Sequence, residues 1–342
     1  MSINKHKKKI LLVGSLFALG VLIFIIVLNK SDYRTILDQL DRITLPQIFW
    51  LILITFTILF FYSANLRLII RSYGPKVPTL KGAVLKLIGD SVSYVTPAMY
   101  IGGEFMIAYI LKKDFRLPVA KGMAANVLEK MITLTVTIFY LVLGAILFLI
   151  KFTEDIKILI PTIIVMTASI CFLIYFYRKT WKNSGALYTL LKLLRLNKIK
   201  FIRKGQVDIE RFDQHLHYFL KYHPRFFLYS LGLVFIGTVI TLFEYKLILF
   251  FLGHDMCLVN ILMLRVIFMA ASAVPIPGAL GTQEAAQAGY FNLLGLGPST
   301  GVAFILVLRF LQLINVTLGL TFLSFFGFKI FKPPQVINGN NE

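Results

Sequence analysis

Long apolar runs separated by short polar segments dominate this sequence. A helix needs about 20 apolar residues to cross the roughly 30 Å hydrocarbon layer of a bilayer. Six runs meet that requirement, at residues 10–28, 46–70, 120–150, 156–177, 225–252 and 300–328. The first run follows a basic N-terminus, as in a secretory signal peptide, but no small-residue cleavage site comes after it. We therefore expect six transmembrane helices, the first an uncleaved anchor, in a single integral membrane domain over residues 1–342.

Two further apolar regions, residues 83–111 and 258–296, are interrupted in the middle by Pro and Gly. Basic residues accumulate in the cytoplasmic loops of membrane proteins. Residues 178–225 hold twelve Lys and Arg against three Asp and Glu, so we assign the basic linker 178–224 and both chain termini to the cytoplasm. With that orientation, the first interrupted region begins and ends on the cytoplasmic face, and the second begins and ends on the opposite face. Both are predicted to form re-entrant helical hairpins.

The two interruptions resemble each other. Glu104 follows Pro97 by seven residues, and Glu284 follows Pro277 by seven residues. Motifs that recur in this way and enter from opposite sides are typical of the inverted repeats of transporters; a chance similarity between two Pro/Gly turns is the alternative. The predicted fold is all-α, a polytopic membrane helix bundle with two opposed re-entrant helical hairpins in an inverted repeat.

The breaks in the hairpins predict a cavity, because irregular backbone at membrane depth is tolerated where protein or a watery space satisfies the freed polar groups. Each restarting helix would point its N–H groups and positive dipole end into that space, where a phosphate or carboxylate is favoured. Glu104 and Glu284 have two interpretations, as lining of the cavity or as charges that complement the helix ends. The candidate substrate-binding residues at the breaks are Pro97, Gly102, Gly103, Glu104, Pro277, Gly278, Gly281 and Glu284.

Other polar side chains within the apolar regions are candidates because ionisable groups inside a membrane are commonly functional. Arg265 and Arg309 suit contact with a lipid phosphate, and pairing with Glu284 or another carboxylate is the structural alternative. Glu129 and Lys130 are adjacent, so they point to different sides of a helix and are expected to pair with other segments. The additional candidates are Asp90, Asn126, Glu129, Lys130 and Gln312.

Composition and charge narrow the function further. The chain is 58% apolar and 15% charged, with a formal net charge of +20. In a soluble protein this charge would suggest nucleic acid, but here the basic residues lie between apolar runs and indicate membrane topology and anionic head groups. Cys171, Cys257 and the histidines of the linker lack the spacing of disulfide or metal sites. No nucleotide-binding or catalytic motif occurs, so we expect no metal, no cofactor, no nucleic acid and no enzyme activity.

A set of motifs in order along the chain resembles a known family. The set comprises Thr96-Pro97, Gly102-Gly103-Glu104, Tyr109, the segment Asn126–Lys130, Pro275 to Gly278, Gly281, Glu284 and the segment Arg309–Gly319. It resembles the lysylphosphatidylglycerol synthase transmembrane-domain family, a flippase-like membrane module found alone or fused to an aminoacyl-phospholipid synthase. The resemblance covers most of the chain and implies a stand-alone member without the synthase domain. Met106 and Ile107 stand where many members have a basic residue, and Lys130 stands where Arg is usual, so the resemblance does not specify the lipid.

The resemblance implies a transporter that moves a phospholipid, such as aminoacylated phosphatidylglycerol or a related lipid, between the leaflets of a bacterial cell membrane. In this hypothesis Glu104 and Glu284 engage the lipid amine or coupling protons, and Arg309 holds the phosphate. The main alternative is a non-transporting accessory subunit that binds anionic or polyprenyl-phosphate lipids for a separate synthase or glycosyltransferase. A transporter of small solutes or ions is a third possibility. Membrane lipids with phosphate head groups are the expected partners, together with a separate lipid synthase.

Overall fold

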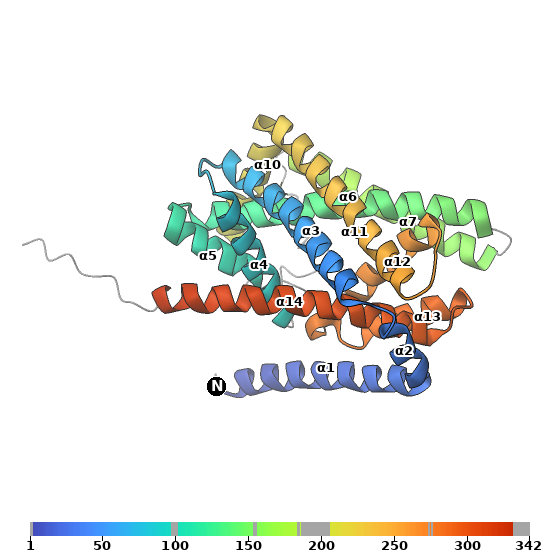
Figure 1. Ribbon diagram of the computed structural model, residues 1–342. Coiled ribbons are helices and arrows are strands. Elements are labelled where there is room, and N and C mark those ends of the chain that lie inside the picture. Colours follow the sequence, from blue (N-terminus) through green and yellow to red (C-terminus); the bar gives the residue numbers. More distant parts are fainter. Residues whose placement is uncertain are drawn as a thin grey trace, which may run out of the picture.

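The computed structural model is helical throughout the part of the chain that it describes (Figure 1). That part forms twelve α-helices and one short 3-10 helix, and it contains no β-strand. The described residues are 3–96, 102–152, 156–182, 185, 206–272, 274 and 276–330. The predicted all-α class is confirmed.

Each of the six predicted transmembrane runs coincides with one long helix. These helices are α1 (Ile3–Lys30), α3 (Leu45–Ser72), α6 (Val119–Phe152), α7 (Ile156–Trp181), α11 (Pro224–Phe251) and α14 (Pro298–Ile330). Within the described residues, four stretches are long and apolar enough to cross a membrane: Leu45–Ser72, Val119–Leu147, Pro224–Phe251 and Pro298–Phe325. Large apolar side chains such as Phe49, Phe139 and Phe250 are exposed along these helices, as expected of surfaces that face lipid. The chain is a multi-pass membrane protein.

A short helix, α2 (Tyr33–Leu40), occupies the segment that we expected as a loop between the first two spans. Asp32 caps it, because its carboxylate accepts hydrogen bonds from the Arg34 N–H at 3.1 Å and from the Thr35 hydroxyl at 2.6 Å. The helix buries Ile36 and Gln39 and packs against α14. It is bent by 91° relative to the apolar part of α1, so the two helices together form a fifth candidate span if they are counted as one broken span.

The basic linker is described in part, and its C-terminal portion forms α10 (Gln206–Tyr222). Residues 183–184 and 186–205 lie outside the described residues. Leu216, Phe219 and Leu220 of α10 are buried, and the helix contacts α6, α7 and α11. Its apolar face therefore packs against the bundle.

His254, in the connection after α11, gives the protein a predicted pH dependence. Its Nε2 lies 3.4 Å from Gln39 Nε2 and 3.5 Å from Thr300 Oγ1. Burial lowers the pKa of His254 below its usual 6.5, and the nearby positive charge of Arg42 lowers this pKa further. As pH falls, His254 is therefore protonated at a higher pH in the unfolded chain than in the folded protein. The contribution of neutral His254 to the free energy of unfolding is present above about pH 6.5 and is lost as pH falls toward the folded pKa.

We expect the apparent melting temperature in detergent to fall between about pH 8 and about pH 5.5, and to fall less in His254→Gln. Differential scanning fluorimetry at several pH values measures this difference. His215, whose pKa is also lowered by burial, remains in both proteins and accounts for a residual slope. Equal slopes for the wild type and the variant would contradict the role of His254.

The first interrupted region forms a hairpin of two packed helices, α4 (Thr79–Val95) and α5 (Gly103–Phe115). The helices are antiparallel, because Gly89 of α4 lies against Gly103 and Ile107 of α5, while Lys81 Nζ lies 5.6 Å from the centroid of the Phe115 ring. A Cβ atom on Gly103 would overlap the carbonyl group of Gly89, so only glycine permits this approach. The predicted break residue Pro97 lies outside the described residues.

The second interrupted region forms a corresponding hairpin from α12 (Leu258–Ser272), η2 (Pro277–Ala279) and α13 (Thr282–Leu293). Its helices are also antiparallel. Thr282 Oγ1 donates to the Ala271 carbonyl at 3.1 Å near the tip, and Tyr290 donates to the Asn260 carbonyl at 3.1 Å near the open end. At the tip, Gly278 and Gly281 have φ values of 59° and 79°, in the left-handed region that favours glycine.

Helix α14 joins the two hairpins. Its N-terminal half contacts α13, where Gly301 lies against the backbone of Gln287, and its C-terminal half contacts α4, where Gly319 lies against Leu87 and Ser91. The two glycine contacts are 319 − 301 = 18 residues apart, which corresponds to about 27 Å along a helix and is close to the thickness of a bilayer core. The hairpins thus approach from opposite ends of α14 (Figure 1), as expected for opposed hairpins.

The tips of the two hairpins meet beside α14. A Cβ atom on Gly278 of η2 would lie 3.0 Å from the ring of Tyr94, which belongs to the last turn of α4. The structure therefore brings together two breaks that are far apart in sequence. The inverted-repeat relation between the hairpins stays a prediction.

Candidate functional site

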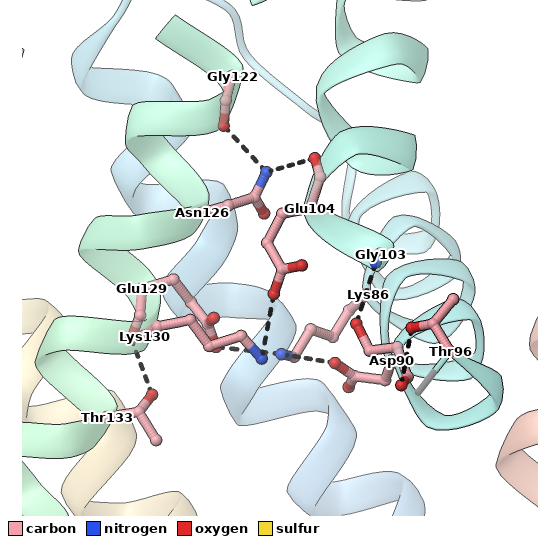
Figure 2. Close-up of polar contacts among 11 residues, drawn as sticks. Lys86, Asp90, Thr96, Gly103, Glu104, Gly122, Asn126, Glu129, Lys130 and Thr133 are labelled. Carbon is pink, nitrogen blue, oxygen red and sulfur yellow. Dashed lines mark hydrogen bonds and ion pairs between the residues drawn. The ribbon is translucent and has the colours of Figure 1, made fainter. Parts of the chain in front are cut away.

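A buried lysine organises the charged residues between the first hairpin and α6. Lys86 Nζ lies 3.0 Å from Asp90 Oδ1, one turn further along α4, and 3.1 Å from Glu129 Oε1 of α6 (Figure 2). The side chains of Lys86 and Glu129 are 8% and 4% exposed, whereas that of Asp90 is 48% exposed. Lys86 therefore neutralises Glu129 inside the protein and positions Asp90 at the edge of an open space.

Glu104 and Lys130 form a second, looser pair beside this cluster. Lys130 Nζ lies 3.9 Å from Glu104 Oε1, and the other carboxylate oxygen of Glu104 has no hydrogen-bond partner among the described residues (Figure 2). Asn126 donates hydrogen bonds to the carbonyls of Glu104 at 3.3 Å and Gly122 at 2.9 Å, which ties α5 to α6. Ser93 Oγ accepts a hydrogen bond from the first N–H of α5, that of Gly103, at 3.1 Å.

At the tip of the second hairpin, Glu284 and Arg309 form a closed set of polar contacts. Glu284 accepts a hydrogen bond from Arg309 Nε at 2.8 Å and another from the Gly281 N–H at 2.7 Å. Arg309 also donates to the Tyr94 hydroxyl at 2.8 Å and to the carbonyl of Gly278. Its Nη2 donates to the Ala279 carbonyl at 3.1 Å. All three guanidinium nitrogens are engaged, so this arginine holds the two hairpin tips together.

A polar cavity lies between the first hairpin and helices α3, α6, α11, α12 and α14. It consists of two adjoining hollows of about 400 Å³ and about 350 Å³ that share several lining residues. The shared residues are Leu59, Asp90, Lys130, Arg265, Phe268, Gln312 and Asn315. Polar groups of both signs thus face one space with apolar walls, which is the usual composition of a ligand-binding site.

Arg265 is the unusual group in this cavity. Its Nη1 donates to the Tyr245 hydroxyl at 3.1 Å, and its guanidinium lies 5.8 Å from the centroid of the Tyr245 ring. Within the described part of the chain, its buried Nε has no hydrogen-bond partner and no carboxylate lies at ion-pairing distance from its guanidinium. The carboxylate of the neighbouring Glu244 instead accepts a hydrogen bond from Thr55 at 2.6 Å. A cation of this kind is suited to bind an anion that enters the cavity.

The structure divides the predicted site residues into three groups. Those that line the polar cavity are Asp90, Glu129, Lys130, Arg265 and Gln312. Those outside the cavity lining, at the contacts of α5 with α4 and α6, are Gly102, Gly103, Glu104 and Asn126. Those at the tip of the second hairpin are Pro277, Gly278, Gly281, Glu284 and Arg309. The two glutamates thus have different surroundings. Arg309 pairs with Glu284, which is the structural alternative considered for it, whereas contact of Arg265 with a lipid phosphate stays a prediction.

A separate, mainly apolar hollow of about 550 Å³ lies between α1 and the hairpin tips. Phe17 of α1, Pro277 and Arg309 contribute to its wall. Tyr94 lines both this hollow and the polar cavity. The contact between Tyr94 and Arg309 therefore lies at the boundary between the two spaces.

Sequence reasoning missed Lys86, Tyr94 and Tyr245. Lys86 had a detectable signal, because it precedes Asp90 by four residues within an apolar helix and such pairs share a helix face. Tyr94 and Tyr245 had none, because a tyrosine in an apolar run is an ordinary core residue. In the described residues no group of three or more His, Cys, Asp and Glu side chains could hold a metal ion.

Comparison with known proteins agrees with this architecture. The family described as Lysylphosphatidylglycerol synthase TM region matches residues 11–319 of the chain. A UPF0104 membrane protein of Methanothermobacter thermautotrophicus (strain Delta H) is 21% identical over 334 residues, which cover 94% of this chain and 96% of that protein. No solved structure matches. The similarity thus extends over nearly the whole length of both sequences. Because the family match extends from the first span into the last, the chain belongs to the lysylphosphatidylglycerol synthase transmembrane-region family.

Proposed function

We propose that the protein moves a phospholipid between the leaflets of the membrane and that the polar cavity binds the lipid head group on the way. The observation that carries the proposal is Arg265, whose guanidinium faces this cavity and forms no contact ion pair with a carboxylate of the described residues. A buried arginine without a contacting carboxylate is costly inside a membrane protein unless an anion compensates it. Glu244 lines the same hollow, but its carboxylate is hydrogen-bonded to Thr55. A lipid phosphate is such an anion, and it is present at high concentration on both sides of the membrane.

The other charges of the cavity suit the rest of a zwitterionic or aminoacylated head group. Lys130, whose side chain is 45% exposed, lines the same space as Arg265 and would share the phosphate. Asp90 keeps 48% of its side chain exposed despite its contact with Lys86, so it can accept an ammonium group. The apolar side chains of Leu59 and Phe268 would then lie beside the glycerol and the first methylene groups.

The opposed hairpins supply a route for movement. In many transporters the substrate site lies near the middle of the membrane between discontinuous helices, and access alternates as one half moves against the other. Here the cavity adjoins the place where the hairpin tips meet, at Tyr94, Gly278 and Arg309. We propose that contact between these tips closes the cavity toward one face of the membrane and that their separation opens it toward that face.

Neutral substitutions of Arg265, which would bind the lipid phosphate, and Asp90, which would bind the lipid amine, test this proposal. We expect Arg265→Gln to slow translocation of all phospholipids by roughly tenfold or more, because a charge-assisted hydrogen bond to phosphate is lost. We expect Asp90→Asn to slow phosphatidylethanolamine and lysylated phosphatidylglycerol more than phosphatidylglycerol, which has no amine. The measurement is the translocation of labelled forms of these three lipids in proteoliposomes, with the wild type as reference.

Lys246→Gln is the matched control, because Lys246 pairs with Asp255 at 3.7 Å at the protein surface and does not line the cavity. We expect it to transport as the wild type does. Normal transport by a folded Arg265→Gln protein would exclude the cavity as the pathway. If folded, inserted wild-type protein moved no lipid at all, transport itself would be refuted and a lipid-binding subunit of a separate synthase would be the better description.

A further inference from the structure

A second, strongly basic pocket lies at the C-terminal end of α3, apart from the polar cavity. Its volume is about 460 Å³, and it shares no lining residue with the two hollows of the cavity. The residues that line it are Ala64, Arg67, Leu68, Arg71, Lys76, Val77 and Leu233. Three of these seven residues are cationic and none is acidic.

Arg67 is held in place by the protein. Its Nε donates a hydrogen bond to the Val77 carbonyl at 2.9 Å, in the connection between α3 and α4. Its side-chain methylene groups occupy the space above Gly82 of α4, where a Cβ atom would overlap them. The hydrogen bond uses one of the three guanidinium nitrogens, so the two terminal nitrogens are available to a ligand in the pocket.

The cations of the pocket have no ion-pair partner among the residues that the structure describes. Arg71 lies four residues after Arg67, so the two side chains share one face of α3 and repel each other. No acidic residue at ion-pairing distance from Arg67, Arg71 or Lys76 is present in the described part of the chain. A single basic residue without an acidic partner at a helix end is explained by solvation at the membrane interface. Three around one hollow, one of them oriented by a backbone carbonyl, indicate an anion site.

The remaining wall of the pocket is apolar. Ala64 and Leu68 of α3 and Leu233 of α11 are partly buried and form this side. A pocket with cations at one end and apolar side chains at the other matches a molecule that carries an anionic group next to hydrocarbon. A free phosphate ion would satisfy the cations but would not use the apolar wall.

We propose that this pocket binds the phosphate of an anionic phospholipid that stays on the protein and is not the transported molecule. A lipid bound there would contact α3, the α3–α4 connection and, through Arg67 and Gly82, the base of the first hairpin. Its effect is to neutralise the repulsion between Arg67 and Arg71 and to stabilise the position of α4. This inference goes beyond the proposed transport and does not depend on it.

Arg71→Gln combined with Lys76→Gln tests the site, because both residues are exposed and neither forms an ion pair within the described part of the chain. Purified protein in a neutral detergent is titrated with dioleoylphosphatidylglycerol, and its apparent melting temperature and the number of lipids retained in native mass spectrometry are followed. We expect the wild type to be stabilised and to retain one more lipid than the variant. We expect the apparent affinity of the variant to be weaker by roughly tenfold or more.

Lys112→Gln combined with Lys113→Gln removes the same charge from the exposed end of α5 and is the matched control. It should bind the lipid as the wild type does. Equal loss in both double variants would overturn the site, because it would show a general effect of surface charge. Absence of any effect of phosphatidylglycerol on the wild type, or equal stabilisation by phosphatidylcholine or by inorganic phosphate, would overturn it as well. None of these measurements requires lipid translocation, so their failure is distinguishable from failure of the transport proposal.

Discussion

Arg309→Gln is expected to destabilise the protein by about 3–5 kcal/mol, because it removes one partner of a buried ion pair. The substitution takes the Nε donor from Glu284, whose side chain is 1% exposed. It also takes donors from the carbonyls of Gly278 and Ala279 and from the Tyr94 hydroxyl. Buried acceptors left without donors add to the loss. Unfolding of the detergent-solubilised protein by increasing amounts of dodecyl sulfate measures the change.

Arg265→Gln is the control for this prediction, because it makes the same substitution in a second membrane-embedded arginine that has no carboxylate partner among the described residues. We expect a loss of about 1 kcal/mol or less, because the hydrogen bond to Tyr245 is lost while the cost of burying this charge is removed. The double variant Arg309→Gln with Glu284→Gln should lose less than the sum of its two single variants, since no charge then stays unpaired. Equal losses for Arg309→Gln and Arg265→Gln would contradict the structural role of Arg309.

Gly103→Ala is expected to prevent the first hairpin from closing, with a loss of about 3 kcal/mol or more. The added Cβ would overlap the carbonyl carbon, carbonyl oxygen and Cα of Gly89. Backbone atoms cannot move aside as a flexible side chain does, so α4 and α5 would have to separate. The consequences are a lower melting temperature and faster hydrogen exchange in both helices, which mass spectrometry resolves by segment.

Gly289→Ala in α13 provides the comparison, because no atom lies within 4 Å of the position that its Cβ would occupy. Alanine is favoured over glycine in a helix by about 1 kcal/mol. We therefore expect this variant to be as stable as the wild type or more stable. If Gly103→Ala behaved in the same way, the close approach of α4 and α5 would not exist in the protein.

The sequence predicts the helical class and the places where helices break, because both depend on local properties. Apolar runs longer than about 20 residues predict the spans, and the glycines at 278 and 281 occupy backbone conformations that other residues rarely adopt. The cap at Asp32 shows that α2 also had a local signal, although the segment looked like a loop.

The chemistry of the cavity could not be predicted in the same way, because its contacts join distant segments. Lys86 and Glu129 are 43 residues apart, and Tyr94 and Arg309 are 215 residues apart. From the sequence, both Arg265 and Arg309 are candidate phosphate ligands or ion-pair partners, and the phosphate is assigned to Arg309, which belongs to the family motif. Their different contacts, Arg309 with Glu284 and Arg265 with Tyr245, depend on the packing of the bundle, which the sequence does not show.

The glycine contacts of α14 also determine which changes in its length the fold can accept. Gly301 and Gly319 are separated by 319 − 301 = 18 residues, and 18 residues are five complete turns of an α-helix, about 3.6 residues each. The two glycines therefore share one helical phase, and both hairpins dock on the same side of α14. A single inserted or deleted residue between them would rotate one docking position by about 100° relative to the other. Sequence changes between Gly301 and Gly319 that preserve the fold are thus limited to substitutions, because these keep the number of residues constant.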